Sequence, residues 1–297
     1  MSKVNLFVIG VNKAGTSWLY YLLDRHPDVF MADVKELYYF GDEGPEGEGP
    51  ETRTAYHSHF PFDEDYRYFG DATVMYYKSA ATADEIQAYN PGARLLAIVR
   101  DPIQRLLSQF RYNKQLGLID EGTTVAEALP ERPYLVRTSH YEETLPAYAE
   151  RFGPEQFRVV SLEAGRADPD AFWADLLNFL DLSHAPRPNE EDRPENPTGS
   201  PSFRAVYRSV VRPLRHRFPQ VYRWLLGSTL ARGAKQAPLH LLGTAGTKAE
   251  ALSPELEARL RENSPRRTPT FETSGSRCTT RREQWAPLPH LRRGADL

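Results

Sequence analysis

Lys13 lies inside a short loop whose glycines and flanking sequence can bind an anion. The loop follows an apolar stretch over residues 4–10, is bracketed by Gly10 and Gly15, and leads into a Thr-Ser helix start. Such a loop directs backbone N–H groups and a helix N-terminus toward an anion, usually a phosphate. The alternative is a structural strand-to-helix turn with an incidental lysine. The combination of buried strand, spaced glycines and lysine favours anion binding.

Arg100 is a second candidate, because it ends another apolar stretch over residues 93–99. Parallel α/β sheets bind their ligands beyond the carboxyl ends of their strands, and both Lys13 and Arg100 follow a predicted strand at that end. The planar guanidinium group of an arginine can hold phosphate oxygens in pairs. The alternative is that Arg100 forms an ion pair with the adjacent Asp101.

The elements that must position these residues alternate between strands and helices, which is typical of a parallel sheet. Strands are expected at residues 4–10, 93–99 and 157–162. Helices are expected at residues 15–26, 79–89, 102–116 and 141–152, and after Asp168-Pro169. We therefore predict an α/β, P-loop-like, three-layer fold with a central parallel sheet flanked by helices.

Taken together, the two segments resemble those of sulfotransferases that use 3′-phosphoadenosine 5′-phosphosulfate (PAPS). The loop keeps the glycine spacing of a nucleotide P-loop, GxxxxGK[ST], but Thr16 stands where that motif has lysine. The lysine lies three positions earlier, inside the loop. The resemblance extends over about residues 4–263 and is to bacterial members similar to the heparan sulfate N- and 3-O-sulfotransferase type.

The resemblance implies a role for each residue. Loop amides and the hydroxyls of Thr16 and Ser17 hold the 5′-phosphate, while Lys13 stabilises charge on the departing phosphate. Arg100 and Ser108 anchor the 3′-phosphate, and Arg105 precedes Ser108 by one turn on the same helix face. The implied cosubstrate-binding residues are Lys13, Ala14, Gly15, Thr16, Ser17, Arg100, Ser108 and Arg204.

Glu36 matches the position of the residue that acts as base on the acceptor in this family. It follows Lys35 and precedes the aromatic pair Tyr39-Phe40. An alcohol is a poor nucleophile at neutral pH and needs such a base. A carboxylate beside an aromatic wall can have its pKa raised toward a useful value. The alternative is a surface turn with a Lys-Glu charge pair.

Residues 70–77 resemble a further family segment, in which Asp71, Thr73 and Tyr76 match in kind. Ala72 replaces a lysine of that segment, which weakens the case for heparan sulfate itself as the acceptor. A buried strand with stacked tyrosines explains Tyr76 equally well.

The composition is that of an ordinary soluble globular protein, with 297 residues, 40% hydrophobic and 26% charged. We expect a single domain over residues 1–263. A formal net charge of −3 gives no reason to expect a nucleic-acid partner. Cys278 is the only cysteine, which excludes an intrachain disulfide, and no apolar run reaches membrane-spanning length. We therefore expect a cytoplasmic location.

The stretch between Glu195 and Glu250 contains no acidic residue. We expect a basic, partly helical segment over residues 198–250. It can close over the cosubstrate or acceptor site, lie on an anionic membrane surface through residues 204–248, or be a solvated cationic face. Residues 264–297 are rich in Arg, Thr, Pro and Ser, and we expect a disordered or divergent tail.

The sequence thus predicts sulfuryl transfer from PAPS to a hydroxyl, less favourably an amine, of a carbohydrate or small natural product. No metal is implied, because no His/Cys cluster is present. One rival is a P-loop kinase using ATP and Mg²⁺, which the missing GK[ST] disfavours. The other is a non-enzymatic nucleotide-binding or membrane-surface adaptor.

Overall fold

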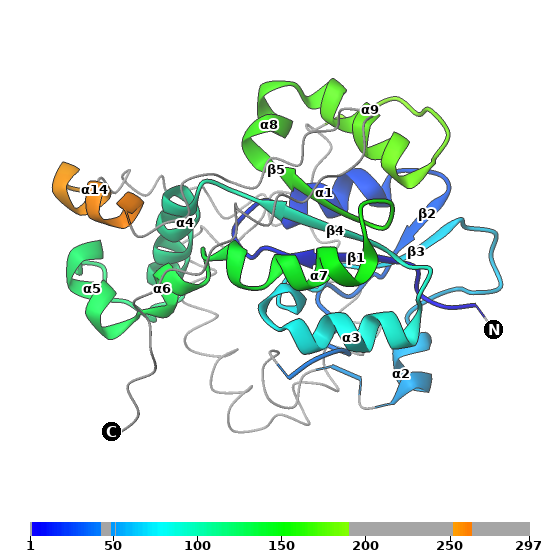
Figure 1. Ribbon diagram of the computed structural model, residues 1–297, viewed down its shortest axis with the longest axis horizontal. Helices are drawn as coiled ribbons and strands as arrows, with labels where there is room; N and C mark the ends of the chain where they lie inside the picture. The colour runs from blue at the N-terminus through cyan, green and yellow to red at the C-terminus, as the bar shows by residue number, and fades with distance from the viewer. Residues whose placement is uncertain (1, 43–48, 51, 190–251, 263–297) are drawn as a thin grey trace, which may run out of the picture.

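Five parallel strands form the centre of the fold in the order β2-β3-β1-β4-β5. The structure, a computed structural model, describes residues 2–42, 49–50, 52–189 and 252–262 (Figure 1). The predicted α/β fold with a central parallel sheet is confirmed. In sheet order the strands are β2 (Val29–Met31), β3 (Tyr68–Asp71), β1 (Leu6–Gly10), β4 (Arg94–Val99) and β5 (Phe157–Ser161).

The central strands are continuous apolar runs because both faces of the sheet are covered. All five residues of β1 are buried. Phe7 and Ile9 belong to the hydrophobic cluster on one face, and Leu6 and Val8 belong to the cluster on the other. This alternation follows from the two-residue side-chain period of a strand.

Helices cover both faces and complete the three layers (Figure 1). On one face lie α1 (Thr16–Asp24), α8 (Leu162–Ala167) and α9 (Pro169–Leu180). On the other lie α2 (Arg53–His57), α3 (Ala80–Tyr89) and α7 (Leu145–Phe152), with the 3₁₀ helices η1 (Tyr76–Lys78) and η2 (Tyr141–Glu143) before α3 and α7.

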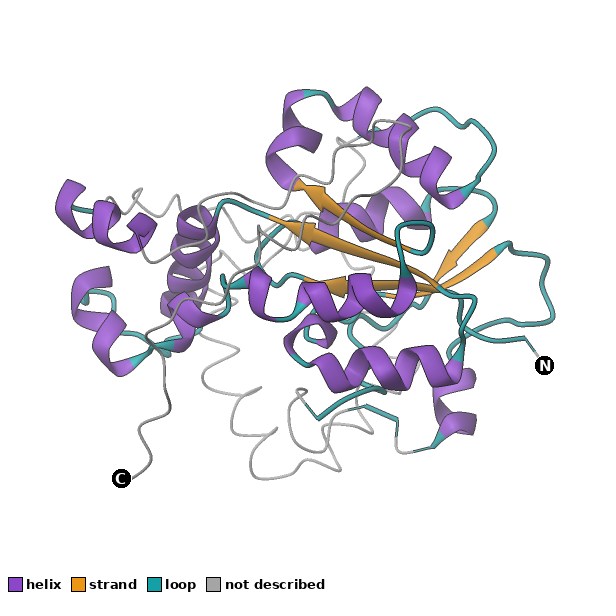
Figure 2. Cartoon of the chain, viewed as in Figure 1, coloured by secondary structure: helices purple, strands orange, loops and turns teal. Residues whose placement is uncertain are grey.

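A separate group of helices lies beyond the carboxyl ends of β4 and β5, where the strand arrows point (Figure 2). The group consists of α4 (Pro102–Gln115), α5 (Val125–Glu131), α6 (Tyr134–Arg137) and α14 (Pro254–Glu262). A third hydrophobic cluster of the molecule lies among these helices and includes Ile103, Phe110, Leu135 and Leu260. Through Leu260, α14 packs against α4.

The predicted helix over residues 141–152 is wrong in its first turn. The structure has a 3₁₀ turn at Tyr141–Glu143, and the α-helix begins only at Leu145. Pro146 lacks the N–H that a helix interior needs, so it fits only in a first turn. The predictions for residues 198–250, Arg204 and residues 264–297 lie outside the described residues.

Candidate active site

The loop after β1 continues the sheet for one residue and then turns sharply. The N–H of Val11 donates to the carbonyl of Ile98 at 2.8 Å, and the N–H of Ala14 donates to the carbonyl of Val11 at 3.1 Å. Gly15, the N-cap residue just before α1, has φ 99° and so lies in the left-handed region that favours glycine. A Cβ at this position would lie 2.7 Å from Cδ1 of Leu162, so any other residue would also displace that side chain.

The start of α1 presents N–H groups that have no acceptor among the described residues. No described side chain caps the helix, and its first turn contains no acidic residue. The carbonyl of Gly15 already accepts from Trp18 and Leu19. Within the described part of the chain, the N–H groups of Gly15, Thr16 and Ser17 donate to no acceptor. These are the donors that an anion at a helix N-terminus satisfies.

Lys13 lies in this loop with its ammonium group against an aromatic ring. Its Nζ is 3.2 Å from the centroid of the Tyr112 ring, and its backbone adopts the left-handed conformation at φ 67°. Burial, and then the nearby ammonium group of Lys35, lower the pKa of Lys13 to about 8, although Glu36 opposes the shift. A half-buried cation held in an uncommon backbone conformation fits a binding role, because an anion would compensate its charge.

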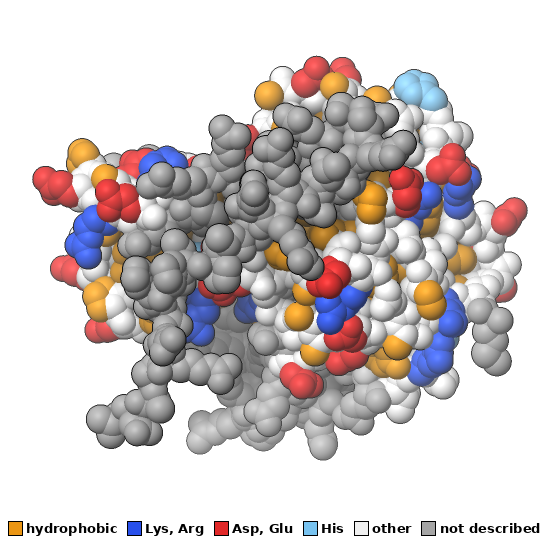
Figure 3. Space-filling model, in the orientation of Figure 1, with side chains coloured by type: hydrophobic (Ala, Val, Ile, Leu, Met, Phe, Trp, Pro, Cys, Tyr) orange, Lys and Arg blue, Asp and Glu red, His pale blue; other side chains and the backbone are white. Residues whose placement is uncertain are grey.

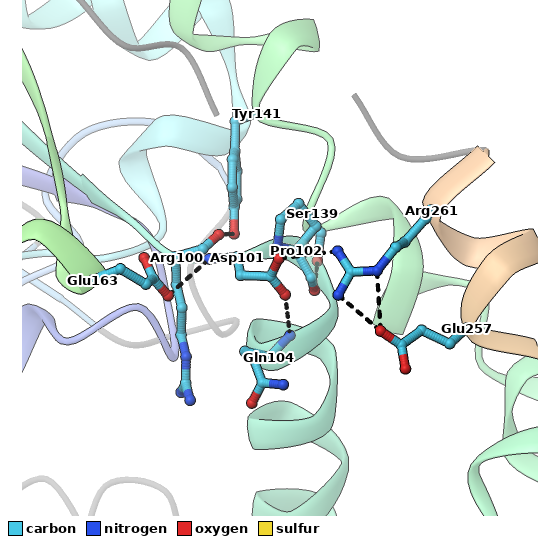
Figure 4. Close-up of polar contacts among 9 residues, drawn as sticks. All are labelled: Arg100, Asp101, Pro102, Gln104, Ser139, Tyr141, Glu163, Glu257 and Arg261. Atoms are coloured by element: carbon cyan, nitrogen blue, oxygen red, sulfur yellow. Dashed lines mark hydrogen bonds and ion pairs between the residues drawn. The ribbon is translucent and has the colours of Figure 1, made fainter. Parts of the chain in front are cut away.

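Arg100 lies beside Lys13 because β1 and β4 are neighbours in the sheet. Its Nη1 donates to the carbonyl of Lys13 at 3.4 Å. Figure 4 shows its side chain pointing away from Tyr141, whose hydroxyl donates to the Arg100 carbonyl at 3.0 Å. Burial, followed by the nearby charge of Arg166, lowers the pKa of Arg100, while Glu163 opposes the shift. Guanidinium groups that repel one another in this way are suited to an anion.

Asp101 does not form an ion pair with Arg100, so the alternative interpretation of Arg100 is wrong. Its Oδ1 accepts the N–H of Gln104 at 2.9 Å, which caps α4, and its Oδ2 lies 3.4 Å from Nη1 of Arg261 (Figure 4). The carboxylate therefore stabilises the helix start and its contact with α14. The guanidinium group of Arg100 is directed instead toward the carbonyl of Lys13.

Ser108 lies on the α4 face that meets the loop. It is half-buried, and Tyr112, one turn later on the same face, carries the ring beneath Lys13. The neighbouring Gln109 accepts from Nδ2 of Asn12 at 2.9 Å, which ties α4 to the loop. Asn12, Gln109 and Tyr112 are not among the site residues predicted from the sequence. The four-residue spacing of Ser108 and Tyr112 was the available signal.

Arg105 is more deeply buried than Ser108. Its side chain is completely buried and turned toward α6. Its Nε donates to Oγ of Ser139 at 2.5 Å, and its Nη2 donates to the carbonyl of Leu135 at 2.6 Å. Arg105 therefore fixes the segment after α4, while its Nη1 is buried without a partner among the described residues. Its charge also contributes to the lowered pKa of Lys13.

Glu36 lies after β2, beside Lys35 and within electrostatic reach of Lys13. Its Oε1 is 3.3 Å from Nζ of Lys35, its Oε2 accepts the N–H of Val74 at 3.3 Å, and its side chain is 14% exposed. Its negative charge raises the pKa of Lys13, which means that the two groups interact electrostatically. The structure thus gathers Lys13, Lys35, Glu36 and Arg100 at the carboxyl ends of the strands.

Positive and negative side chains are mixed on the face that Figure 3 shows. On the described part of the face in Figure 3, Lys and Arg side chains are interspersed with Asp and Glu. Within the described ranges, no group of three or more His, Cys, Asp and Glu side chains is arranged to hold a metal ion.

Comparison with known proteins identifies a family for this chain. The family model described as "Sulfotransferase domain" matches residues 3–195. A membrane-associated sulfotransferase of Dictyostelium discoideum is 32% identical over 111 residues, which are 37% of this chain and 23% of that protein. The human heparan sulfate glucosamine 3-O-sulfotransferase 5 is 30% identical over 188 residues, 59% of this chain and 52% of that protein.

A solved structure supports the fold. A sulfotransferase from Alicyclobacillus acidocaldarius superposes with a TM-score of 0.56 at 23% identity, over 75% of this chain and all of that one. The chain spans about a quarter of the Dictyostelium protein and about half of the human one.

The expected cytoplasmic location is contradicted by the Dictyostelium relative, which is a membrane-associated protein. In the ranges described by the structure, no helix has both the length and the apolar character to span a bilayer.

Proposed function

This chain belongs to the sulfotransferase family, and we propose that it transfers the sulfuryl group of PAPS to a hydroxyl of a carbohydrate or small natural product. The observation that carries the proposal is that Lys13 lies beside a helix start whose N–H groups have no acceptor in the described ranges, and within electrostatic reach of Glu36. The human relative, named for a heparan sulfate sugar, supports a sugar hydroxyl as the acceptor class.

In the proposed reaction the acceptor oxygen attacks the sulfur of PAPS. The bond between that sulfur and the bridging oxygen of the 5′-phosphate breaks, and its electron pair stays on the phosphate. The acceptor proton passes to Glu36. The products are a sulfate ester and 3′-phosphoadenosine 5′-phosphate (PAP). Lys13 stabilises the negative charge that develops on the departing phosphate.

Arg100 and Ser108 are proposed to bind the 3′-phosphate. The support is the repulsion between Arg100 and the arginines around it, and the position of Ser108 on the α4 face that meets the loop. A 3′-phosphate is the group that distinguishes PAP from ATP. Loss of the Arg100 guanidinium should therefore weaken the binding of PAP more than the binding of nucleotides without a 3′-phosphate.

A thermal shift tests this cosubstrate. PAP should raise the melting temperature of the purified protein, because a ligand that binds only the folded state stabilises it. Arg100→Ala should lose most of that shift. Arg158→Ala is the matched control, because Arg158 is a half-buried arginine paired instead with Asp175 at 2.7 Å. Stabilisation by ATP with Mg²⁺, and none by PAP, would overturn the proposal in favour of a kinase.

PAP binding should also take up protons at mildly alkaline pH. Lys13, whose pKa is about 8, is half neutral near that pH. A bound phosphate favours the ammonium form and raises the pKa, so about half a proton should be taken up per PAP at about pH 8. Calorimetry in two buffers of different ionisation enthalpy measures this uptake.

Lys13→Arg is the control for the proton uptake, because an arginine stays charged throughout this pH range. The uptake should vanish in that variant. An equal uptake in wild type and Lys13→Arg would mean that another group carries the proton.

A further inference from the structure

Asp71, the last residue of β3, is a completely buried carboxylate. Its Oδ1 accepts the hydroxyl of Thr73 at 2.7 Å. Its Oδ2 accepts the hydroxyls of Tyr76 at 2.9 Å and Tyr56 at 3.0 Å. No lysine or arginine of the described residues pairs with it. A buried charge without a cation needs all of its hydrogen bonds, so these three hydroxyls carry its stabilisation.

Two of these hydroxyls also hold the backbone that follows Glu36. Oγ1 of Thr73 accepts the N–H groups of Leu37 at 3.1 Å and Tyr38 at 3.4 Å. The hydroxyl of Tyr76 accepts the N–H groups of Tyr39 at 3.0 Å and Phe40 at 3.4 Å. Four consecutive backbone N–H groups therefore donate to only two side-chain hydroxyls.

Counting protons fixes the state of Asp71. Each hydroxyl has one proton, and one that accepts backbone N–H groups must donate that proton elsewhere. For Thr73 and Tyr76 the acceptor is Asp71. The third donor, Tyr56, is held by stacking on Tyr39, with ring centroids 4.2 Å apart. Only the ionised carboxylate accepts from all three without bringing a proton of its own.

We propose, on the basis of the function above, that Asp71 is a positioning residue for Glu36. Through Thr73 and Tyr76 the ionised carboxylate anchors residues 37–40 and so keeps the neighbouring Glu36 directed at the Lys13 loop. The carboxylate of Glu36 itself rests on the N–H of Val74, in the segment between Thr73 and Tyr76. The network therefore fixes both the carboxylate of Glu36 and the backbone that follows it.

The network should release Glu36 in acid. Burial raises the pKa of Asp71 to about 6, the three hydroxyls oppose the shift, and the charge of Glu36 raises it further. The other titratable groups facing it are the phenols of Tyr56 and Tyr76, whose pKa values burial raises well above their usual range. Below about pH 6 Asp71 gains a proton, and one hydroxyl must turn away from it.

The test uses Thr73→Val, which removes the hydroxyl at nearly constant volume, and Thr73→Ser, which keeps it. A small misplacement of a catalytic group can cost about 10²-fold in rate, so Thr73→Val should lower kcat by about 10- to 100-fold. Its affinity for PAP should stay within about twofold of wild type, because the phosphate-binding residues are untouched. Thr73→Ser should restore most of kcat.

The matched control is Tyr68→Phe, because Tyr68 is a buried tyrosine whose hydroxyl donates to the Leu180 carbonyl at 2.8 Å, away from Glu36. It should leave kcat and its pH profile unchanged. In wild type, kcat should fall below about pH 6, together with the hydrogen-exchange protection of residues 37–40. In Thr73→Val that protection should already be lost at neutral pH.

Wild-type kcat or wild-type protection of residues 37–40 in Thr73→Val would overturn the proposal. A lowered kcat that Thr73→Ser does not restore would also overturn it. If the wild-type protein transfers no sulfuryl group at all, the proposed function fails. Exchange at residues 37–40 then still decides, separately, whether Asp71 anchors this segment.

Discussion

Lys13→Ala should reduce the rate of sulfuryl transfer by about 10²- to 10³-fold, the usual loss when one group that stabilises developing charge is removed. The lysine lies in the loop after β1 with its ammonium group on the Tyr112 ring, and we propose that it stabilises the departing phosphate from there. Burial there lowers the pKa of Lys13 to about 8, which means that its positive charge is poorly compensated in the free protein. The ammonium group is therefore stabilised when negative charge develops on a phosphate beside it. The affinity for PAP should fall by a smaller factor than the rate, because the N–H groups of Gly15, Thr16 and Ser17 remain to bind the phosphate.

The measurement is conversion of PAPS to PAP in the presence of sugar and small-molecule acceptors. Lys3→Ala is the matched control, because Nζ of Lys3 donates to the Tyr89 carbonyl at 2.7 Å, away from the loop. Lys13→Arg should recover only part of the activity, since its charge is kept but its shape differs. Activity in Lys13→Ala equal to that of wild type would remove Lys13 from the mechanism.

The sequence predicts the part of the site that depends on local patterns and on one rule of topology. Gly10, Gly15 and the apolar stretch before them define the loop without any tertiary information. The carboxyl-end rule then brings Lys13 and Arg100 to the same edge, and the pairing of β1 with β4 makes them neighbours.

The sequence does not predict contacts between distant segments. Arg105 lies on the same helix face as the predicted ligand-binding Ser108, yet its side chain is fixed by Ser139 and Leu135, which are 34 and 30 residues away in the sequence. Asp71 matches a family segment in kind, but its role depends on Tyr56 and on amides near Glu36. Side-chain burial of this sort is decided by packing, which periodicity does not encode.

Some elements were missed although a local signal was present. Helix α5 begins with a capping box, in which Thr124 accepts from the N–H of Glu127 and the Glu127 side chain accepts from the N–H of Thr124. That pattern is legible as Thr-x-x-Glu. The helix has only seven residues and Pro130 near its end, so its hydrophobic periodicity is too short to predict it.

Glu36→Gln should lower kcat by about 10²- to 10⁴-fold, the range over which a positioned general base contributes. The glutamine carbonyl can still accept the Val74 N–H, so the backbone around residue 36 should keep its structure. PAP affinity should change little. Because the charge of Glu36 raises the pKa of Lys13, the substitution should lower that pKa further. Activity is therefore compared at about pH 6.5, where Lys13 remains protonated in both proteins.

Glu85→Gln is the control that separates a lost base from a lost loop contact. Glu85 also accepts a backbone N–H from this loop, that of Gly41 at 2.8 Å. The Glu85→Gln variant should keep nearly full activity, because Glu85 contacts the backbone at Gly41 and is not among the charges that shift the pKa of Lys13. Glu36→Asp keeps the charge on a shorter side chain and should recover part of kcat. If Glu36→Gln and Glu85→Gln lost activity equally, the carboxylate of Glu36 would matter only for loop structure. If neither lost any, the acceptor proton would have to pass to another group.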